Sequence, residues 1–409
     1  MKSSEAVTAG HLLLFSTTTG YQLRMFAEAA RQLGVRYTLA TDRCDQMDDP
    51  WADGAIPVKY DDPAASAAQL AANAKFTGVM ALGDRTTFLA ALTAERLGIP
   101  FHPPHAVEAS INKFLTKQRF QAAGLLVPEY TRHSVGDAPP SVNFPCVLKP
   151  IGLSGSQGVV RANNQQEFDA AFQRIRKLLS DPTLTHRADP RLSFIQVESY
   201  IPGKEFALEG AVTGGVLRVI ALFDKPDPLE GPFFEETIYV TPSRADAATQ
   251  DAICTAARRG VAALGLSQGP IHAEMRVNEE GVWLLEIAPR SIGGYCAKAL
   301  RFQGGMSLEE FLLRHALGQD LSGLNPEPGA SGVMMIPIPK DGIYKGVTGH
   351  EEVDDVIITA VPGQRVRMFP EANSYLGFIF ARATTPEFVV RDLRAAHQKL
   401  TFDIATALL

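Results

Sequence analysis

The sequence has little of three things: cysteine, unbroken apolar stretches and positive charge. No apolar run reaches bilayer length, and the N-terminal run at residues 12–15 is too short for a signal sequence, so we expect no membrane partner. The net charge of −6 and the lack of a basic run argue against a nucleic-acid partner. The four cysteines are scattered without a CxxC pair, which indicates core residues in a reducing, cytoplasmic compartment rather than disulfides or a zinc site. They are Cys44, Cys146, Cys254 and Cys296.

Strand and helix patterns alternate in the first quarter of the chain. Strands are expected at residues 11–15, 35–40 and 78–82, and helices at residues 21–33 and 86–97. This rhythm predicts a small parallel α/β domain, which we assign to residues 1–105. Its small-residue turn at residues 17–20 is not GxGxxG, so we expect no dinucleotide site there. Asp84 follows a strand, where it either contacts a ligand or caps the next helix.

The rest of the sequence divides into a central unit, residues 106–318, and a C-terminal unit, residues 319–409. The central unit has helix patterns near residues 109–123, 165–179 and 247–264, with strands and a polar loop at residues 183–190 among them. The C-terminal unit opens with a polar stretch, continues with short strands and has a last helix at residues 386–400. A chain of 409 residues is long enough for a core in each unit. No heptad pattern indicates an oligomeric state.

The most informative stretch is a predicted hairpin, IHAEMRVNEEGVWLLEIAPRSIGG. Residues 271–277 alternate apolar and polar side chains, residues 278–281 supply a turn, and residues 282–287 form a second strand. Glu274 and Glu286 can therefore project from the same face, as a pair of carboxylates suited to magnesium. Arg290 follows four residues later and could hold an oxyanion. A glutamate pair on a hairpin is often only a solvated surface, but Glu286 lies inside the apolar run WLLEIAP, which favours a functional site.

Two further segments suggest nucleotide binding. Lys149 lies on a predicted strand just before the loop GLSGSQG, and Lys113 lies upstream. Backbone N–H groups and serine hydroxyls of such a loop could cover phosphate oxygens, although most Gly/Ser loops are plain turns. The second segment, residues 198–205, offers a strand edge for adenine and a carboxylate for ribose, or it is only a polar edge strand that ends in a turn.

The order of these elements resembles the ATP-grasp superfamily over almost the whole chain. The quoted motifs are INKFLTKQRFQAAGLLVPEY, VLKP, GLSGSQGV, VESYIPGKEF and HAEMR…EIAPRSIGG, in that order. The segment SYLGFIFARATTPEFVVRDLRAAHQKLTF makes the L-amino acid ligases the most similar group. The resemblance implies an α/β ATP-grasp fold with an N-terminal, Rossmann-like pre-ATP-grasp domain and a small C-terminal α+β capping domain.

The resemblance also implies roles for individual residues. Two lysines would bind the α- and β-phosphates, a Gly/Ser loop would close over them, two residues would contact adenine, and one would hold the ribose. The lysines are Lys113 and Lys149, and the loop residues are Ser154, Ser156, Gln157 and Gly158. The adenine residues are Glu198 and Ile201, and the ribose residue is Glu205. Glu274 and Glu286 would bind magnesium or manganese, and Arg290 would stabilise an acyl-phosphate and a tetrahedral intermediate. Glu236, in PFFEETIYVTPS, aligns with an active-site acid of the family.

Three positions depart from the family pattern. Ala288 stands where an asparagine often supplies another metal ligand, Tyr239 stands where the amino acid ligases often carry a histidine, and Asn112 replaces a common aspartate. The residues that the resemblance assigns to phosphate binding, to metal binding and to the intermediate are all present. Tyr239 suggests altered substrate recognition.

The implied reaction joins a small-molecule carboxylate to an amine, with two amino acids as the expected pair, and converts ATP to ADP through an acyl-phosphate. This chemistry needs charge neutralisation above all, which two lysines, carboxylate-held magnesium and an arginine would supply. The alternatives are a carboxylase-like or purine-pathway ATP-grasp enzyme and a non-catalytic ATP-binding module. Cys296 lies near the site, but we interpret it as a packing residue.

Overall fold

The computed structural model describes residues 10–17, 21–42, 54–73, 75–370 and 374–406. Cys44 and most of the small-residue turn at 17–20 lie outside these residues. Within the described ranges, no helix is both long enough and apolar enough to cross a bilayer. The cysteines within these ranges, Cys146, Cys254 and Cys296, are free thiols.

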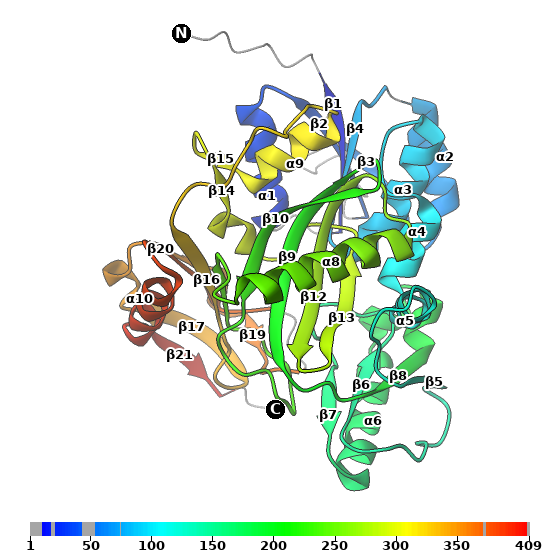
Figure 1. The fold of residues 1–409 in the computed structure, drawn as a ribbon, viewed down its shortest axis with the longest axis vertical. Coiled ribbons are helices and arrows are strands. Elements are labelled where there is room, and N and C mark those ends of the chain that lie inside the picture. Colours follow the sequence, from blue (N-terminus) through cyan, green and yellow to red (C-terminus); the bar gives the residue numbers. More distant parts are fainter. Residues whose placement is uncertain (1–9, 18–20, 43–53, 74, 371–373, 407–409) are drawn as a thin grey trace.

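The N-terminal part is the expected parallel α/β unit (Figure 1). Its four strands pair in parallel in the order β3-β2-β1-β4, because each strand returns to the sheet through a helix or a longer connection. The strands are β1 (His11–Ser16), β2 (Arg36–Thr41), β3 (Ala55–Pro57) and β4 (Gly78–Leu82), and the helices are α1 (Tyr21–Gln32), α2 (Pro63–Asn73) and α3 (Asp84–Leu97).

The prediction of a single helix near residues 109–123 is wrong. Two helices, α4 (Pro104–Ile111) and α5 (Lys113–Ala122), meet at Asn112. Asn112 has an extended backbone, with φ −113° and ψ 102°. Its side chain accepts hydrogen bonds from the backbone N–H groups of Phe114 and Leu115, at 3.1 and 3.2 Å. Asn112 is therefore the N-cap of α5, a position that asparagine favours strongly.

A smaller antiparallel sheet follows, in the order β5-β8-β6-β7, with α6 packed on it. The polar stretch at residues 183–190, expected to be a loop, contains most of the short helix α7. The elements are β5 (Tyr130–Ser134), β6 (Cys146–Pro150), β7 (Val160–Ala162), α6 (Gln165–Leu179), α7 (Pro182–Thr185), the 3-10 helix η1 (Pro190–Ser193) and β8 (Phe194–Ser199).

The largest sheet has eight strands in the order β13-β12-β9-β10-β11-β16-β20-β18, all antiparallel to their neighbours. It runs across the expected division at residue 318, since β16, β20 and β18 come from the C-terminal unit and β16 pairs with β11 of the central unit. The strands are β9 (Lys204–Thr213), β10 (Val216–Asp224), β11 (Ile238–Thr241), β12 (Gly269–Asn278), β13 (Gly281–Ala288), β16 (Ala330–Ile336), β18 (Val356–Ile358) and β20 (Gly377–Ala383).

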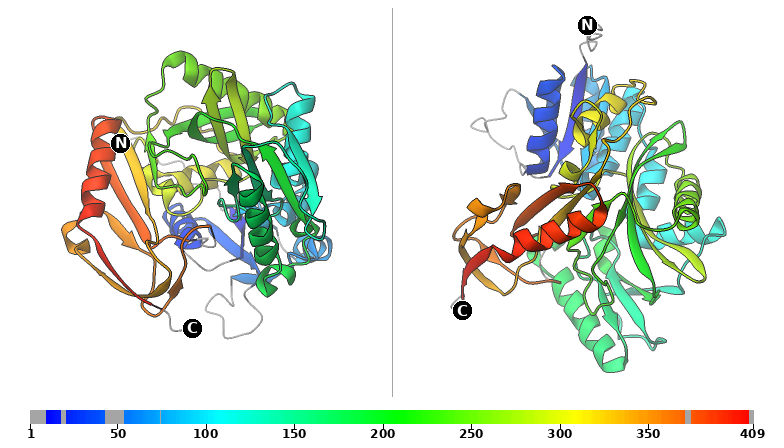
Figure 2. Two further views of the ribbon diagram at one scale, coloured as in Figure 1. Left: turned by 90° about the horizontal axis from the view of Figure 1, so that it is seen from below. Right: turned by 60° about the vertical axis from the view of Figure 1, so that its left-hand side comes forward.

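Helix α8 (Ala247–Leu264) lies across β9, β12 and β13 (Figure 1), and α10 (Pro386–Gln398) packs on β16 and β20 at the edge of the molecule away from α2 (Figure 2). A three-stranded sheet, β19-β17-β21, completes the C-terminal part. The remaining elements are η2 (Cys296–Ala299), β14 (Arg301–Phe302), β15 (Met306–Ser307), α9 (Leu308–Ala316), β17 (Gly342–Thr348), η3 (His350–Glu352), β19 (Arg365–Val366) and β21 (Thr401–Ala405).

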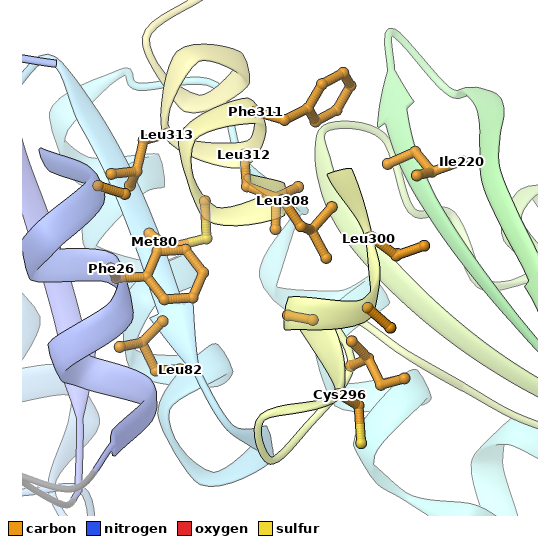
Figure 3. Packing of buried hydrophobic residues seen from close by; sticks show 14 of the residues in the cluster. Phe26, Met80, Leu82, Ile220, Cys296, Leu300, Leu308, Phe311, Leu312 and Leu313 are labelled. Atoms are coloured by element: carbon orange, nitrogen blue, oxygen red, sulfur yellow. The ribbon is translucent and has the colours of Figure 1, made fainter. Parts of the chain in front are cut away.

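Helix α9 joins the N-terminal sheet to the rest of the molecule. Ser307 and Glu310 form a capping box that fixes its first turn. Leu308 and Leu312 of α9 lie in the same core as Phe26 of α1 and Met80 of β4 (Figure 3). These side chains are buried in one continuous core that also contains Leu82 of β4 and Ile292 of the loop after β13, so burial of apolar surface holds the end of β4, just before α3, and that loop in a fixed relation.

Candidate active site

One cavity lies between the small sheet and the eight-stranded sheet. Its walls come from β6 and β8 on one side, from β9, β12 and β13 on the other, and from Phe369 and residues 374–378 of the C-terminal part. Among the described residues, Ser154, Gln157 and Gly158 lie outside its lining. The predicted residues that line it are Lys113, Lys149, Ser156, Glu198, Ile201, Glu205, Glu236, Glu274, Glu286 and Arg290.

The predicted hairpin places Glu274 and Glu286 directly opposite each other. They are register partners on β12 and β13, and the register shifts just after Glu274, where Met275 pairs with Leu284. Directly opposed residues of an antiparallel pair project from the same face. Each carboxylate nevertheless has its own lysine: Lys225 Nζ lies 2.8 Å from Glu274 Oε1, and Lys113 Nζ lies 3.7 Å from Glu286 Oε2.

Lys225 was not predicted from the sequence, yet it lies at the centre of the carboxylates. Its ammonium contacts Glu205 Oε1 at 2.9 Å and Glu274 Oε1 at 2.8 Å, and it also pairs with Glu236. The side chain is only 3% exposed. Burial and the charge of Glu274 raise the pKa of Glu236 to about 8. For Glu274, burial is the largest single effect and acts in the same direction, but the charge of Lys225 and the hydrogen bonds from His272 and Glu236 together lower its pKa well below the ordinary value.

This carboxylate group fits a divalent cation. Ligand oxygens of Glu205, Glu236 and Glu274 lie within 4.8 Å of one another. Hard carboxylate oxygens are the ligands that magnesium and manganese prefer. Glu286 adds another carboxylate to the same cavity. Ala288 offers no ligand atom and is the register partner of His272.

A second charged group lines the same cavity. Lys149 Nζ donates to Glu198 Oε2 at 2.6 Å, and Gln196 Nε2 donates to Glu198 Oε1 at 2.6 Å. Lys117, which was not predicted, lies 3.9 Å from Glu198 and donates to the backbone carbonyls of Leu284 and Leu285. Burial opposes ionisation of Glu198, but the two lysines lower its pKa to about 2.

The Gly/Ser loop connects β6 and β7 and has an unusual backbone. Gly155, Ser156 and Gly158 all have positive φ, at 61°, 53° and 74°. Lys113 Nζ donates to the carbonyl of Leu153 at 2.6 Å, which ties α5 to the loop. A Cβ on Gly158 would lie 2.8 Å from Pro150 Cγ, so packing alone requires glycine there.

Arg290 is held by the N-terminal part of the chain. Its Nε and Nη2 donate to the two carboxylate oxygens of Asp84, each at 3.0 Å. Although burial opposes it, the charges of Arg290 and Lys113 lower the pKa of Asp84. The N-cap alternative for Asp84 is wrong, because Gly83 is the N-cap of α3 and Asp84 is its first residue.

A buried His–Glu pair supports the same region and was also missed. His272 Nδ1 lies 3.1 Å from Glu209 Oε2, and both oxygens of Glu209 accept from the backbone N–H of Ile292 at 3.1 Å. His272 precedes Glu274 by two residues on β12, so both side chains lie on one face. That alternation, and a glutamate inside the apolar run ALEGAV, were the available signals.

Cys296 packs as expected. It is 3% exposed and belongs to the core shared with α9. Burial raises the pKa of its thiol, so the nucleophilic thiolate is disfavoured.

Three domain families match the chain. The ATP-grasp N-terminal domain matches residues 27–101, the ATP-grasp domain matches residues 142–299, and the L-amino acid ligase C-terminal domain 2 matches residues 334–405. Carnosine synthase 1 from Gallus gallus is 31% identical over 247 residues, covering 58% of this chain and 26% of that protein. The chain spans less than two thirds of the first curated relatives that it matches, at 64%, 26% and 53% of their lengths.

Two solved structures show how far the fold is shared. An L-amino acid ligase from Bacillus licheniformis superposes with a TM-score of 0.83 at 25% identity, covering 97% of this chain and 99% of that one. A phosphoribosylglycinamide synthetase from Anaerococcus prevotii, at 15% identity, covers 97% of this chain and 100% of that one with a TM-score of 0.69, a likeness of fold alone. The matched domains and the shared fold show that the chain belongs to the ATP-grasp superfamily and carries a C-terminal domain of the L-amino acid ligase type.

Proposed function

We propose that the protein is an ATP-dependent carboxylate–amine ligase that forms an amide or peptide bond, with amino acids as the expected substrates. The observation that carries the proposal is the common cavity, in which the lysines, the carboxylates and Arg290 all face one space. The names of two similar proteins, an L-amino acid ligase and a carnosine synthase, support the proposal.

We assign the nucleotide to the end of the cavity between the two sheets. The Glu198 carboxylate already accepts a hydrogen bond from Lys149. The adenine would therefore contact the backbone edge of residues 199–201 and the apolar side chain of Val147. Lys113 and Lys149 would bind the α- and β-phosphates, and the loop at residues 154–158 would cover them. Glu205 would hold the ribose.

In the reaction, the substrate carboxylate attacks the γ-phosphate of ATP, and the bond from that phosphorus to the bridging oxygen of ADP breaks. An amine then attacks the acyl-phosphate carbonyl, phosphate leaves, and the amine loses a proton. Magnesium held by Glu274 and Glu286 would neutralise phosphate charge. Arg290, oriented by Asp84, would stabilise the oxygen that becomes negative during amine attack.

The carboxylate and amine would occupy the end of the cavity near the C-terminal part. Apolar and aromatic side chains line that end, and they would exclude water from an acyl-phosphate that water hydrolyses. They are Met335, Phe369, Tyr375 and Phe378. Tyr239 donates to Glu274 Oε1 at 3.3 Å, so the tyrosine touches the carboxylate group as well as the cavity.

The test is product formation from Mg-ATP with amino acids supplied singly and in all pairs, with ADP separated from AMP and amides sought by mass. We expect ADP release that depends on a pair, together with a new amide. AMP and pyrophosphate would overturn the acyl-phosphate route. Turnover that requires bicarbonate or a sugar-phosphate amine would favour the carboxylase-like or purine-pathway alternative, and ATP binding without ADP release from any pair would favour a binding module.

A further inference from the structure

The buried ammonium of Lys225 occupies the space that a metal ion would share with Glu274. Its three carboxylate partners come from three different strands or connections: Glu205 from β9, Glu236 from the segment before β11, and Glu274 from β12. The ring of Tyr239 covers the ammonium, whose nitrogen lies 5.0 Å from the ring centroid. A side chain with this many fixed partners is held in one place.

The partners differ in how much they depend on Lys225. Glu205 also pairs with Arg276, whose Nε lies 2.8 Å from Glu205 Oε2. Glu274 has His272 Nε2 at 3.8 Å as a second neighbour. Without Lys225, the three carboxylates would face one another within 4.8 Å in a buried site. Ionised carboxylates so close repel one another strongly, so a cation, or a proton on one of them, is needed to keep them together.

A free divalent ion and Lys225 compete for the same carboxylate. An ion bound to Glu274 Oε1 at the usual distance for magnesium would lie within about 5 Å of Nζ, because Nζ itself is 2.8 Å from that oxygen. Repulsion between the two cations is large in a site with little water. The negative phosphates of a nucleotide reverse this balance, since they attract both cations.

We propose that Lys225 is a positioning residue that acts as an internal cation: it holds Glu205, Glu236 and Glu274 together in the nucleotide-free protein and excludes free divalent metal until nucleotide phosphates arrive. The inference rests on the proposed function, because it takes Glu274 as a metal ligand. It predicts an order of binding in which metal enters with the nucleotide.

The test is a titration of the full chain with Mn²⁺ alone. The electron paramagnetic resonance signal of free Mn²⁺ reports how much of the ion is bound. We expect weak binding by the wild type and at least a tenfold rise in Mn²⁺ affinity for Lys225→Met, which removes the charge and keeps a similar length. Lys204→Met is the matched control, because Lys204 precedes Glu205 on β9 and is exposed. It should bind Mn²⁺ like the wild type.

Removing Lys225 alone could prevent folding, so a charge-balanced comparison is included. Lys225→Met combined with Glu236→Gln removes the lysine together with one of its carboxyl partners, and it should bind Mn²⁺ more tightly than Glu236→Gln alone. Equal or weaker binding in both comparisons would overturn the inference, as would tight nucleotide-free binding by the wild type. Pair-dependent ADP release is measured separately on the wild type, so failure of the ligase proposal is distinguished from failure of this one.

Discussion

Arg290 and Asp84 form a two-point ion pair, with both donor–acceptor distances at 3.0 Å, although 206 residues separate them in the chain. Asp84 opens α3 of the N-terminal part, and Arg290 follows the last strand of the hairpin. The core around α9 holds the two segments together (Figure 3). The N-terminal part therefore orients the proposed catalytic arginine, although none of its described sheet residues lines the cavity.

The first prediction concerns this pair. Asp84→Asn should lower kcat by about 100-fold, because a neutral amide no longer fixes the guanidinium and small displacements at a reacting centre are costly. The KM for ATP should change little, since the lysines that we assign to the phosphates are untouched. Steady-state ADP release measures both parameters. Asp61→Asn, at an exposed position, is the control, and an unchanged kcat in Asp84→Asn would contradict the role given to Arg290.

The second prediction concerns the hairpin. Glu286→Gln should abolish ADP formation, at a loss of at least about 100-fold, because the amide keeps the shape but loses the charge needed beside the phosphates. The fold should survive, since Glu286 is partly exposed and Lys113 also bonds to Leu153. Circular dichroism and an ADP assay on the same sample separate the two effects. Glu279→Gln in the exposed turn is the matched control, and retained turnover in Glu286→Gln would count against the site.

Sequence patterns predicted the elements that depend on contacts between residues close in the chain. The hairpin register that opposes Glu274 and Glu286 follows from alternation and a short turn, and the parallel N-terminal sheet follows from the strand–helix rhythm. Lys225 could not be found in this way, because its three partners lie 11, 20 and 49 residues away on other segments. The break at Asn112 was missed because the helical pattern continues on both sides of a single capping residue.

The third prediction concerns Glu209, which is fully buried and links β9 to both His272 and the backbone of Ile292. Glu209→Gln places an amide NH₂ where one of these donors needs an acceptor. One buried donor is then unpaired, which costs about 1–3 kcal/mol of stability. Urea unfolding should show this loss. Because Ile292 follows Arg290 by two residues, kcat should fall as well.

Two comparisons separate positioning from simple destabilisation by Glu209→Gln. Glu108→Gln, on the exposed side of α4, should change neither unfolding nor kcat. A temperature low enough to keep the Glu209→Gln protein fully folded should leave its kcat defect in place. Recovery of full kcat under those conditions would show that Glu209 only stabilises the fold.

The fourth prediction is a pH dependence that comes from His102, a histidine buried between the N-terminal part and β12. Its Nε2 lies 3.1 Å from the carbonyl of Pro270, and its Nδ1 accepts from the backbone N–H of Gln268 at 3.3 Å. This arrangement requires the neutral ring with its proton on Nε2, because a proton on Nδ1 would face another donor. Burial lowers the pKa of His102 from 6.5 to about 4.

The sign follows from which state binds more protons. Between pH 6.5 and 4 the unfolded chain protonates this histidine and the folded chain does not. The contribution of His102 to stability is therefore complete above pH 6.5 and falls by about 3 kcal/mol as the pH drops to 4. Urea unfolding across this range should show a steeper loss for the wild type than for His102→Gln, which can donate and accept but does not titrate. His350→Gln, at an exposed histidine, should keep the wild-type slope, whereas equal slopes for wild type and His102→Gln would mean that His102 is not held neutral in the fold.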